Sequence, residues 1–155
     1  MIIGSQKAGL TTLKEYLSHS PKDIYLNQYY ARILTLQKKY TEAIKHYRFM
    51  SANKLIDFSD ISVAKKMALL NIEAKKFIDA TTFIESLKDK DVNSYNYLYG
   101  VFNTKKNNYK KAENFFKKVD KNDNNYINAV KEISKIKINK KEFSLLKKFF
   151  NIQYN

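Results

Sequence analysis

Residues 37–44 have the sequence Gln37-Lys-Lys-Tyr40-Thr-Glu-Ala43-Ile44, and this order of residue types returns three more times along the chain. A short run containing lysine or asparagine leads to an aromatic residue, and a small or apolar residue stands three positions after the aromatic. The other copies are Ala74–Thr81, Asn107–Glu113 and Asn139–Leu146. The small or apolar residues fall at Ala43, Ala80, Ala112 and Leu146, with spacings of 37, 32 and 34 residues. A recurrent spacing of this length indicates a repeat protein.

Each of the first three copies also has a second small residue, 12 positions before the first. These residues are Ala31, Ala68 and Gly100. The combined pattern resembles the tetratricopeptide repeat (TPR), a helix–turn–helix unit of 34 residues. The resemblance implies that the two small residues of a unit let antiparallel helices approach closely, and that the aromatic opens the second helix. The chain departs from the family pattern because it has no Trp and only one proline, Pro21.

The resemblance implies an all-α fold, a right-handed α-solenoid of antiparallel helix pairs with about nine helices. Apolar residues at 3.6-residue periodicity predict helices over about 5–18, 23–37, 41–53, 60–74, 77–88, 92–105, 109–118, 124–138 and 141–151. We expect a single array over 1–155, in which a partial repeat over 1–22 precedes repeats over 23–56, 60–91, 92–124 and 125–155. The count of 3 glycines and 1 proline is too low for an all-β sandwich or a Rossmann-type sheet.

The composition excludes several classes of site. With no cysteine, the chain has no thiol nucleophile, no disulfide scaffold and no Cys-ligated metal centre. Residues 1–6 do not form a secretory signal, and no apolar run approaches the roughly 20 residues that span a bilayer. We therefore expect a cytoplasmic protein without a membrane span.

The charge is strongly basic and unevenly distributed. The net charge is +14, from 29 Lys and Arg against 15 Asp and Glu, and Arg32 and Arg48 are the only arginines. Residues 86–155 carry 16 basic and 7 acidic side chains, and residues 1–85 carry 13 and 8. A basic surface attracts nucleic acid or acidic protein. The abundance of Lys, Asn, Ile and Tyr together is also typical of AT-rich coding sequence, and arginine, the residue suited to bidentate phosphate and base contacts, is scarce.

One segment suggests an enzyme. Residues 4–13, Gly-Ser-Gln-Lys-Ala-Gly-Leu-Thr-Thr-Leu, are similar to the loop that binds 3′-phosphoadenosine 5′-phosphosulfate in sulfotransferases. The resemblance implies a strand, a phosphate-binding loop carrying Lys7 and a following helix. The competing interpretation is one helix with Leu10, Leu13 and Leu17 on its apolar face. A truncated sulfotransferase-like fragment therefore stays open as a third hypothesis of function.

No other catalytic or metal-binding constellation is evident. His19 and His46 are the only histidines, and neither has carboxylates at ligand spacing. We expect His19 at a helix end and His46 on an exposed helix face. Asp57, Asp60 and Asp79 are interpreted as helix caps and surface charges. We expect no enzyme, no metal and no cofactor.

In proteins of the TPR family, one face of the first helix of each repeat lines an inner groove. On this chain that face would carry Tyr25, Gln28, Tyr29, Arg32, Lys65, Lys66, Leu69, Tyr97, Leu98, Val101, Asn128, Lys131 and Lys135. Aromatic rings and basic groups in one groove suit an extended or helical peptide that bears carboxylates. The first hypothesis is therefore a scaffold or adaptor that binds a protein segment in this concave groove. The second is a basic helical-repeat module that binds RNA or another polyanion.

One end of the array is predicted to be covered, and the C-terminal end is the better candidate. Phe149, Phe150, Ile152 and Tyr154 lie close together in a helix that places apolar residues on more than one face. A terminal repeat that lacks a polar cap exposes the surface that a neighbour would cover. We expect self-association, a partner chain or further repeats at this end.

Overall fold

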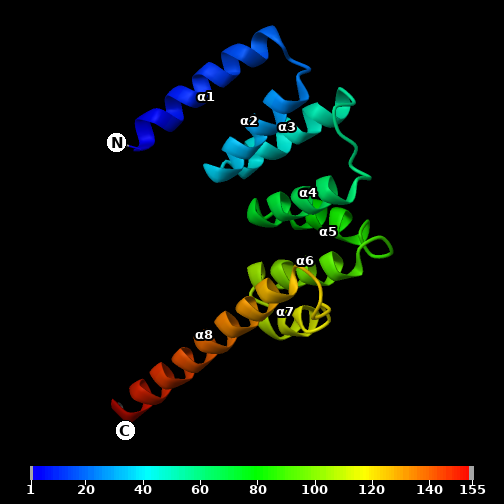
Figure 1. Ribbon diagram of the computed structural model, residues 1–155. Helices are drawn as coiled ribbons and strands as arrows, with labels where there is room; N and C mark the ends of the chain where they lie inside the picture. The colour runs from blue at the N-terminus through cyan, green and yellow to red at the C-terminus, as the bar shows by residue number, and fades with distance from the viewer. Residues whose placement is uncertain (1, 154–155) are drawn as a thin grey trace. The chain divides into compact units, whose positions relative to one another are not determined.

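The computed structural model describes the backbone of residues 2–153 and the side chains of residues 9–142 and Ser144. This part of the chain is all-α, with eight helices and no strand (Figure 1). The helices are α1 (Ile2–His19), α2 (Ile24–Leu36), α3 (Tyr40–Ala52), α4 (Ile61–Glu73), α5 (Phe77–Glu85), α6 (Val92–Lys105), α7 (Tyr109–Phe116) and α8 (Tyr126–Gln153). The ends of α1 to α7 lie within three residues of the sequence prediction.

The chain divides into two compact units, with the boundary between Ser86 and Leu87. In the first unit each helix from α1 to α5 packs against the next one along the chain, and in the second unit α6 packs against α7 and α7 against α8. Three-residue turns join α2 to α3, α4 to α5 and α6 to α7, so each of these pairs is an antiparallel helix hairpin (Figure 1).

The three turns share one backbone geometry. Each contains one residue with positive φ, at Lys38 (58°), Lys75 (58°) and Asn107 (61°). The next residue donates its N–H to the carbonyl five positions earlier at 2.8–2.9 Å, in the pairs Lys39–Leu34, Lys76–Asn71 and Asn108–Asn103. This pattern is the Schellman motif, which ends a helix by satisfying its last carbonyl groups. The first three copies of the sequence motif therefore form the same local structure.

The small residues of the motif are all buried. These buried residues are Ala31, Ala43, Ala68, Ala80, Gly100 and Ala112. Ala31 and Ala43 belong to the core of the first unit, with Leu34, Ile44 and Met50, and Ala112 belongs to the core of the second, with Phe116 and Ala129. Tyr47, Phe102 and Phe116 are buried, and five further aromatics of the helix pairs are half-buried: Tyr30, Tyr40, Phe77, Tyr99 and Tyr109. The side chains of Phe143 and Phe150 lie outside the described residues.

The fourth copy of the motif does not form a turn. Two helices were predicted over 124–138 and 141–151, but α8 runs through both segments as one helix of 28 residues. The prediction of a separate helix pair over 125–155 was wrong. Lys140, Lys141 and Glu142 are good helix formers, and Glu142 is an extra residue between the basic pair and the aromatic. A turn at this point would break helical hydrogen bonds, and only the packing of the second helix back against the first would compensate for their loss. α8 keeps these hydrogen bonds and continues as one helix.

The N-terminal segment is helical from Ile2 to His19. The sulfotransferase-like alternative needs a strand and a loop in residues 2–13, and neither is formed there. The Lys7 side chain lies outside the described residues, as do those of Phe149, Phe150, Ile152 and Tyr154. None of the helices in the described part is long and apolar enough to cross a membrane.

Candidate functional site

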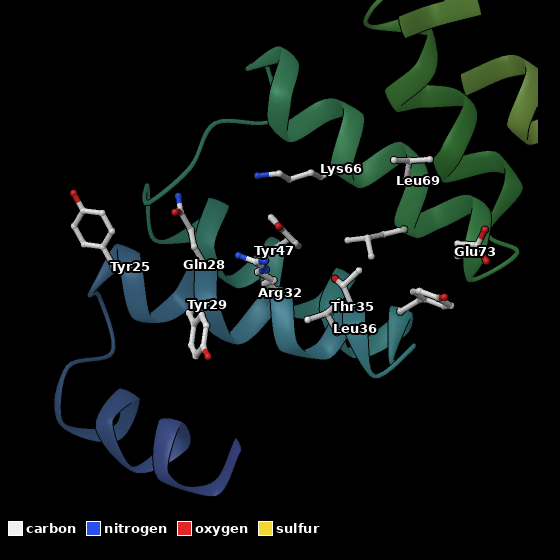
Figure 2. A pocket seen from close by; sticks show the side chains of 12 residues that line it. Tyr25, Gln28, Tyr29, Arg32, Thr35, Leu36, Tyr47, Lys66, Leu69 and Glu73 are labelled. Atoms are coloured by element: carbon white, nitrogen blue, oxygen red, sulfur yellow. The ribbon is translucent and has the colours of Figure 1, made fainter. Parts of the chain in front are cut away.

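A pocket of the first unit, named the α2/α4 pocket, has a volume of about 510 Å³. It is lined by Tyr25, Gln28, Tyr29, Arg32, Thr35, Leu36, Tyr40, Tyr47, Lys66, Leu69, Leu70 and Glu73. Figure 2 shows that the lining side chains come from two helices that face each other, α2 and α4, with α3 contributing between them. The volume lies in the range of sites that hold small molecules or peptide side chains.

The periodicity of each helix places its lining side chains on one face of that helix. In α2 the lining positions are 25, 28, 29, 32, 35 and 36, and the opposite face buries Asn27, Ala31 and Leu34. In α4 they are 66, 69, 70 and 73, which follow the same spacing of three and four residues. Both helices begin at an aspartate cap that accepts a backbone N–H, from Leu26 to Asp23 at 2.9 Å and from Val63 to Asp60 at 3.0 Å.

The pocket combines an apolar floor with exposed aromatic rings and charges. Tyr47 and Leu70 form buried parts of the wall, and burial raises the pKa of the Tyr47 phenol, which therefore stays neutral at neutral pH. Tyr25 is 80% exposed and Tyr29 is 57% exposed, so ring surface is available to a ligand. The ionic groups are two cations, Arg32 and Lys66, and one carboxylate, that of Glu73.

Six of the thirteen residues predicted on the groove face line this pocket: Tyr25, Gln28, Tyr29, Arg32, Lys66 and Leu69. Lys65 does not line it and is half-buried on the neighbouring face of α4. Thr35, Leu36, Leu70 and Glu73 also line the pocket but were not predicted, although each stands three or four residues after a predicted member. Two residues of α3, Tyr40 and Tyr47, also line the pocket and were not among the predicted groove residues.

The predicted groove residues of the second unit have mixed environments. Tyr97 and Val101 are half-buried and pack against the core of that unit, and the Tyr97 ring lies 5.9 Å from the Phe116 ring. Burial and the Glu132 carboxylate raise the pKa of Tyr97, and Lys135 acts in the opposite direction. Leu98 was expected in the groove, but it is 2% exposed and belongs to the interior.

Three further predicted groove residues lie on α8. Asn128, Lys131 and Lys135 are exposed, and Lys135 Nζ lies 2.6 Å from Glu132 Oε1. The hydrogen bond from Lys135 to Glu132 raises the pKa of this lysine. Lys131 and Lys135 therefore lie on a solvent-facing side of α8.

His46 was expected on an exposed helix face, and this prediction was wrong. The imidazole is half-buried, with its ring centroid 4.7 Å from that of Tyr30 and 5.8 Å from that of Phe49. Burial lowers the pKa of His46, and the backbone carbonyl of Asn27 opposes that shift. His19 is exposed in the last turn of α1, as predicted.

The three aspartates have structural roles of the kind predicted. Asp60 caps α4, and Asp57 accepts hydrogen bonds from the backbone and hydroxyl of Ser59. Asp79 pairs with Arg48 at 3.1 Å. In the part of the chain that the structure describes, no three His, Asp or Glu side chains are grouped so that they could hold a metal ion. Comparisons with protein-family models, curated proteins and solved structures found no match for this chain.

Proposed function

We propose that this chain is a non-enzymatic protein-binding module, a TPR-like array of helix pairs that holds a peptide or protein segment along its α2/α4 pocket. The observation that supports the proposal is the lining of one pocket by Tyr25, Tyr29, Arg32, Lys66 and Leu69, which come from two different helices. Their shared position was expected from the TPR resemblance and depends on the packing of α2, α3 and α4.

The chemistry of the pocket suits a segment that carries both apolar and acidic side chains. The rings of Tyr25 and Tyr29 offer flat, rigid contact surface at low entropic cost. Arg32 on α2 and Lys66 on α4 supply positive charge, and a guanidinium can hold a carboxylate through two parallel hydrogen bonds. Glu73 stands at the other end of the α4 lining, so a bound segment would meet opposite charges at different positions of the pocket.

A random peptide library displayed on phage tests this function, because the selection itself identifies the preferred sequence. We expect selection on the full chain to enrich peptides that contain an aromatic or aliphatic residue beside Asp or Glu. The selected peptides should bind the Arg32→Glu/Lys66→Glu variant at least roughly tenfold more weakly, because two favourable charge contacts become repulsive.

The matched control is Lys22→Glu/Lys45→Glu, which changes the net charge equally at exposed positions that do not line the pocket. This variant should bind the selected peptides nearly as well as the unmodified chain. Equal loss in both variants would mean that net charge alone drives binding. Failure to enrich any peptide that competes for the pocket would contradict the proposal.

A second candidate, binding of RNA or another polyanion, is favoured by the ionic contacts of the second unit. Five of its seven acidic side chains are already engaged by a lysine or by backbone N–H groups: Asp91, Glu113, Asp120, Asp123 and Glu132. Glu113 lies 2.9 Å from Lys117 and 4.0 Å from Lys140, and the hydrogen bond from Lys117 lowers the pKa of this carboxyl group. The 16 lysines after residue 85 also outnumber the 7 acidic side chains, so this part of the chain carries a net positive charge.

Fluorescence anisotropy with a labelled oligouridylate tests this candidate. Binding through phosphate contacts should weaken steeply as salt rises, because released counterions drive the association. Lys131→Glu should reduce the salt dependence and Arg32→Glu should not. Binding that is insensitive to salt, or no binding at low salt, would remove this candidate and leave the peptide-binding function unaffected.

A further inference from the structure

A second pocket of the first unit, named the His46 pocket, has a volume of about 290 Å³. It is lined by Leu17, Ser18, Pro21, Asn27, His46 and Phe49. These residues come from the end of α1, the turn after it, α2 and α3. None of them lines the α2/α4 pocket, so the two pockets are separate sites.

Asn27 lines this pocket and carries a buried acceptor with a fixed orientation. The residue is 1% exposed, and its Nδ2 donates to the backbone carbonyls of Pro21 at 2.9 Å and Asp23 at 2.7 Å. Because both amide hydrogens are engaged, the orientation of the amide is set and Oδ1 must point away from those carbonyls. Oδ1 is buried and has no hydrogen-bond partner among the described residues. An unmet buried acceptor costs about 1–3 kcal/mol, which a bound donor would recover.

His46 lines the same pocket and carries a second buried polar atom, Nε2. Its ring is held by edge contact with Tyr30 and by stacking on Phe49. Nε2 is buried and, within the described part of the chain, has no hydrogen-bond partner. Burial lowers the pKa of His46, so the imidazole is neutral at neutral pH. In a neutral imidazole, Nε2 is a donor in one tautomer and an acceptor in the other.

The remaining walls restrict the charge of a ligand. Leu17, Pro21 and Phe49 are apolar, and no carboxylate, lysine or arginine is among the described residues that line the pocket. A charged ligand would lose its hydration without gaining an opposite charge, whereas a neutral polar group loses much less. The volume lies just below the range of about 300–1,000 Å³ for sites of drug-sized ligands, so the pocket suits a small molecule or the end of one side chain.

We propose that the His46 pocket binds a primary amide, whose NH₂ group donates to Asn27 Oδ1 while its NH₂ or carbonyl group bonds to His46 Nε2. A primary amide carries both a donor and an acceptor, so it satisfies either tautomer of the imidazole. The amide can belong to a free small molecule or to an Asn or Gln side chain of a protein.

Titration of acetamide into the ¹⁵N-labelled full chain, followed by NMR, tests the proposal. We expect saturable shifts of the Asn27 side-chain amide and of the His46 ring nitrogens. Ethylammonium and acetate, which match acetamide in size but carry a charge, should produce no saturable shift at these atoms. A blocked glutamine, N-acetylglutamine amide, forms the second arm. Its competition with acetamide would assign the site to protein side chains as well, and its exclusion would assign it to free molecules.

His46→Phe is the decisive variant because it keeps an aromatic ring against Tyr30 and Phe49 and removes Nε2. Acetamide should bind this variant about tenfold more weakly, as judged from the Asn27 side-chain signals, which corresponds to the loss of one hydrogen bond. His19→Phe, at the exposed histidine, should bind acetamide like the unmodified chain. Absence of saturable shifts at any acetamide concentration that leaves the chain folded, or equal affinity in the His46→Phe variant, would overturn the proposal.

Discussion

The Phe116 ring occupies the space in which a side chain on Gly100 would stand. A Cβ atom built on Gly100 would lie 2.3 Å from Cε1 of Phe116 and 2.4 Å from Cδ1. Gly100 is in the middle of α6, Phe116 is the last residue of α7, and the ring is almost completely buried in the core of the second unit. The glycine therefore determines how closely α6 and α7 pack.

Gly100→Ala should destabilise the chain. Alanine gains about 0.5–1 kcal/mol of helix propensity over glycine, but at this position the added methyl group forces a buried ring to move. We expect a net loss of about 1–3 kcal/mol in the free energy of unfolding, measured by chemical denaturation. Phe116→Leu removes the ring that the new methyl group would meet, so it should reduce the cost of Gly100→Ala. The double variant should therefore lose less stability than the sum of the losses in the two single variants.

Gly9 supplies the matched control for this experiment. It is also a helical glycine, but a Cβ atom there would meet no atom within 4 Å. Gly9→Ala should therefore stabilise the chain by up to about 1 kcal/mol through helix propensity alone. Equal effects of the two substitutions would show that the contact between Gly100 and Phe116 does not limit the packing of α6 and α7.

Glycine should be favourable at the positive-φ positions of the turns. Lys38, Lys54 and Lys75 have φ of 58–59°, a conformation that a residue with a Cβ adopts at a cost of about 1–2 kcal/mol. Lys38→Gly and Lys75→Gly should each stabilise the chain by about 0.5–1 kcal/mol, because the relief of strain exceeds the entropy that glycine loses on folding. Lys39→Gly tests whether the stabilisation by glycine is specific to positions with positive φ. Lys39 has φ of −83°, so glycine there should destabilise.

The turns also explain why most of the fold could be predicted. The sequence contains few glycines and prolines, yet the run of lysine or asparagine before Tyr40, Phe77 and Tyr109 marks three helix ends correctly. The same residue types at 139–141 lie inside α8 and do not mark a helix end. A helix ends where the following segment packs back against it, and local composition does not encode that packing. The continuous α8 was therefore not predictable from the motif.

The candidate site could be predicted only in part, for a related reason. The spacing of Tyr25, Tyr29 and Arg32 places them on one face of a helix, and that face lines the α2/α4 pocket. Leu98 was misassigned because neighbouring positions on a helix differ by about 100°, so an error of one residue moves a side chain from groove to core. The environment of His46 depends on α1 and the turn at Pro21, which the periodicity of α3 does not reveal.

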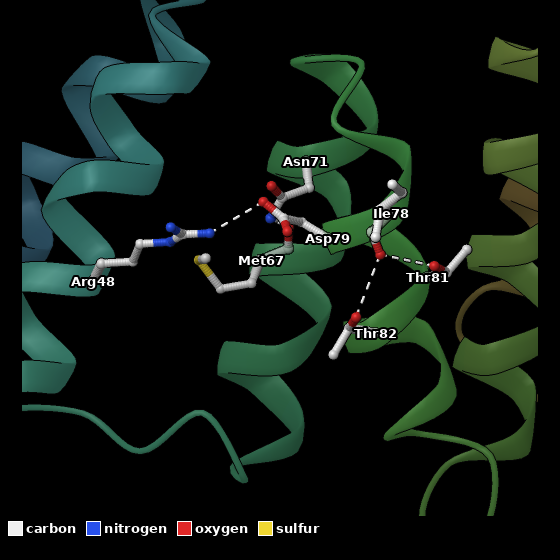
Figure 3. Close-up of polar contacts among 7 residues, drawn as sticks. All are labelled: Arg48, Met67, Asn71, Ile78, Asp79, Thr81 and Thr82. Atoms are coloured by element: carbon white, nitrogen blue, oxygen red, sulfur yellow. Dashed lines mark hydrogen bonds and ion pairs between the residues drawn. The ribbon is translucent and has the colours of Figure 1, made fainter.

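The ion pair between α3 and α5 should contribute little to stability. Arg48 Nη2 lies 3.1 Å from Asp79 Oδ2, and the two side chains remain 55% and 41% exposed. Figure 3 shows this pair. Exposed pairs contribute about 0.2–1 kcal/mol, because water screens the charges and both side chains lose mobility. A double-mutant cycle with Arg48→Met and Asp79→Asn should give a coupling energy below about 1 kcal/mol, which falls further at high salt. A coupling energy well above this value would mean that the pair is shielded from solvent.

The buried histidine should make the stability of the chain depend on pH. The folded-state pKa of His46 lies below its ordinary value of 6.5, because burial disfavours the charged imidazolium. As the pH falls below that ordinary value, the unfolded chain takes up a proton that the folded chain does not, and the free energy of unfolding decreases. The decrease is complete once the pH is below the folded-state pKa.

Denaturation curves between about pH 7.5 and pH 5.5, a range above the main titration of the carboxyl groups, measure this effect. The unmodified chain should lose stability across the range, and the His46→Phe variant should lose less because the titrating group is gone. His19→Phe, which removes the exposed histidine at the end of α1, should keep the pH dependence of the unmodified chain. If His46→Phe retains the full loss of stability, His46 is protonated as readily in the folded chain as in the unfolded one, and its environment is more polar than its contacts with Tyr30 and Phe49 indicate.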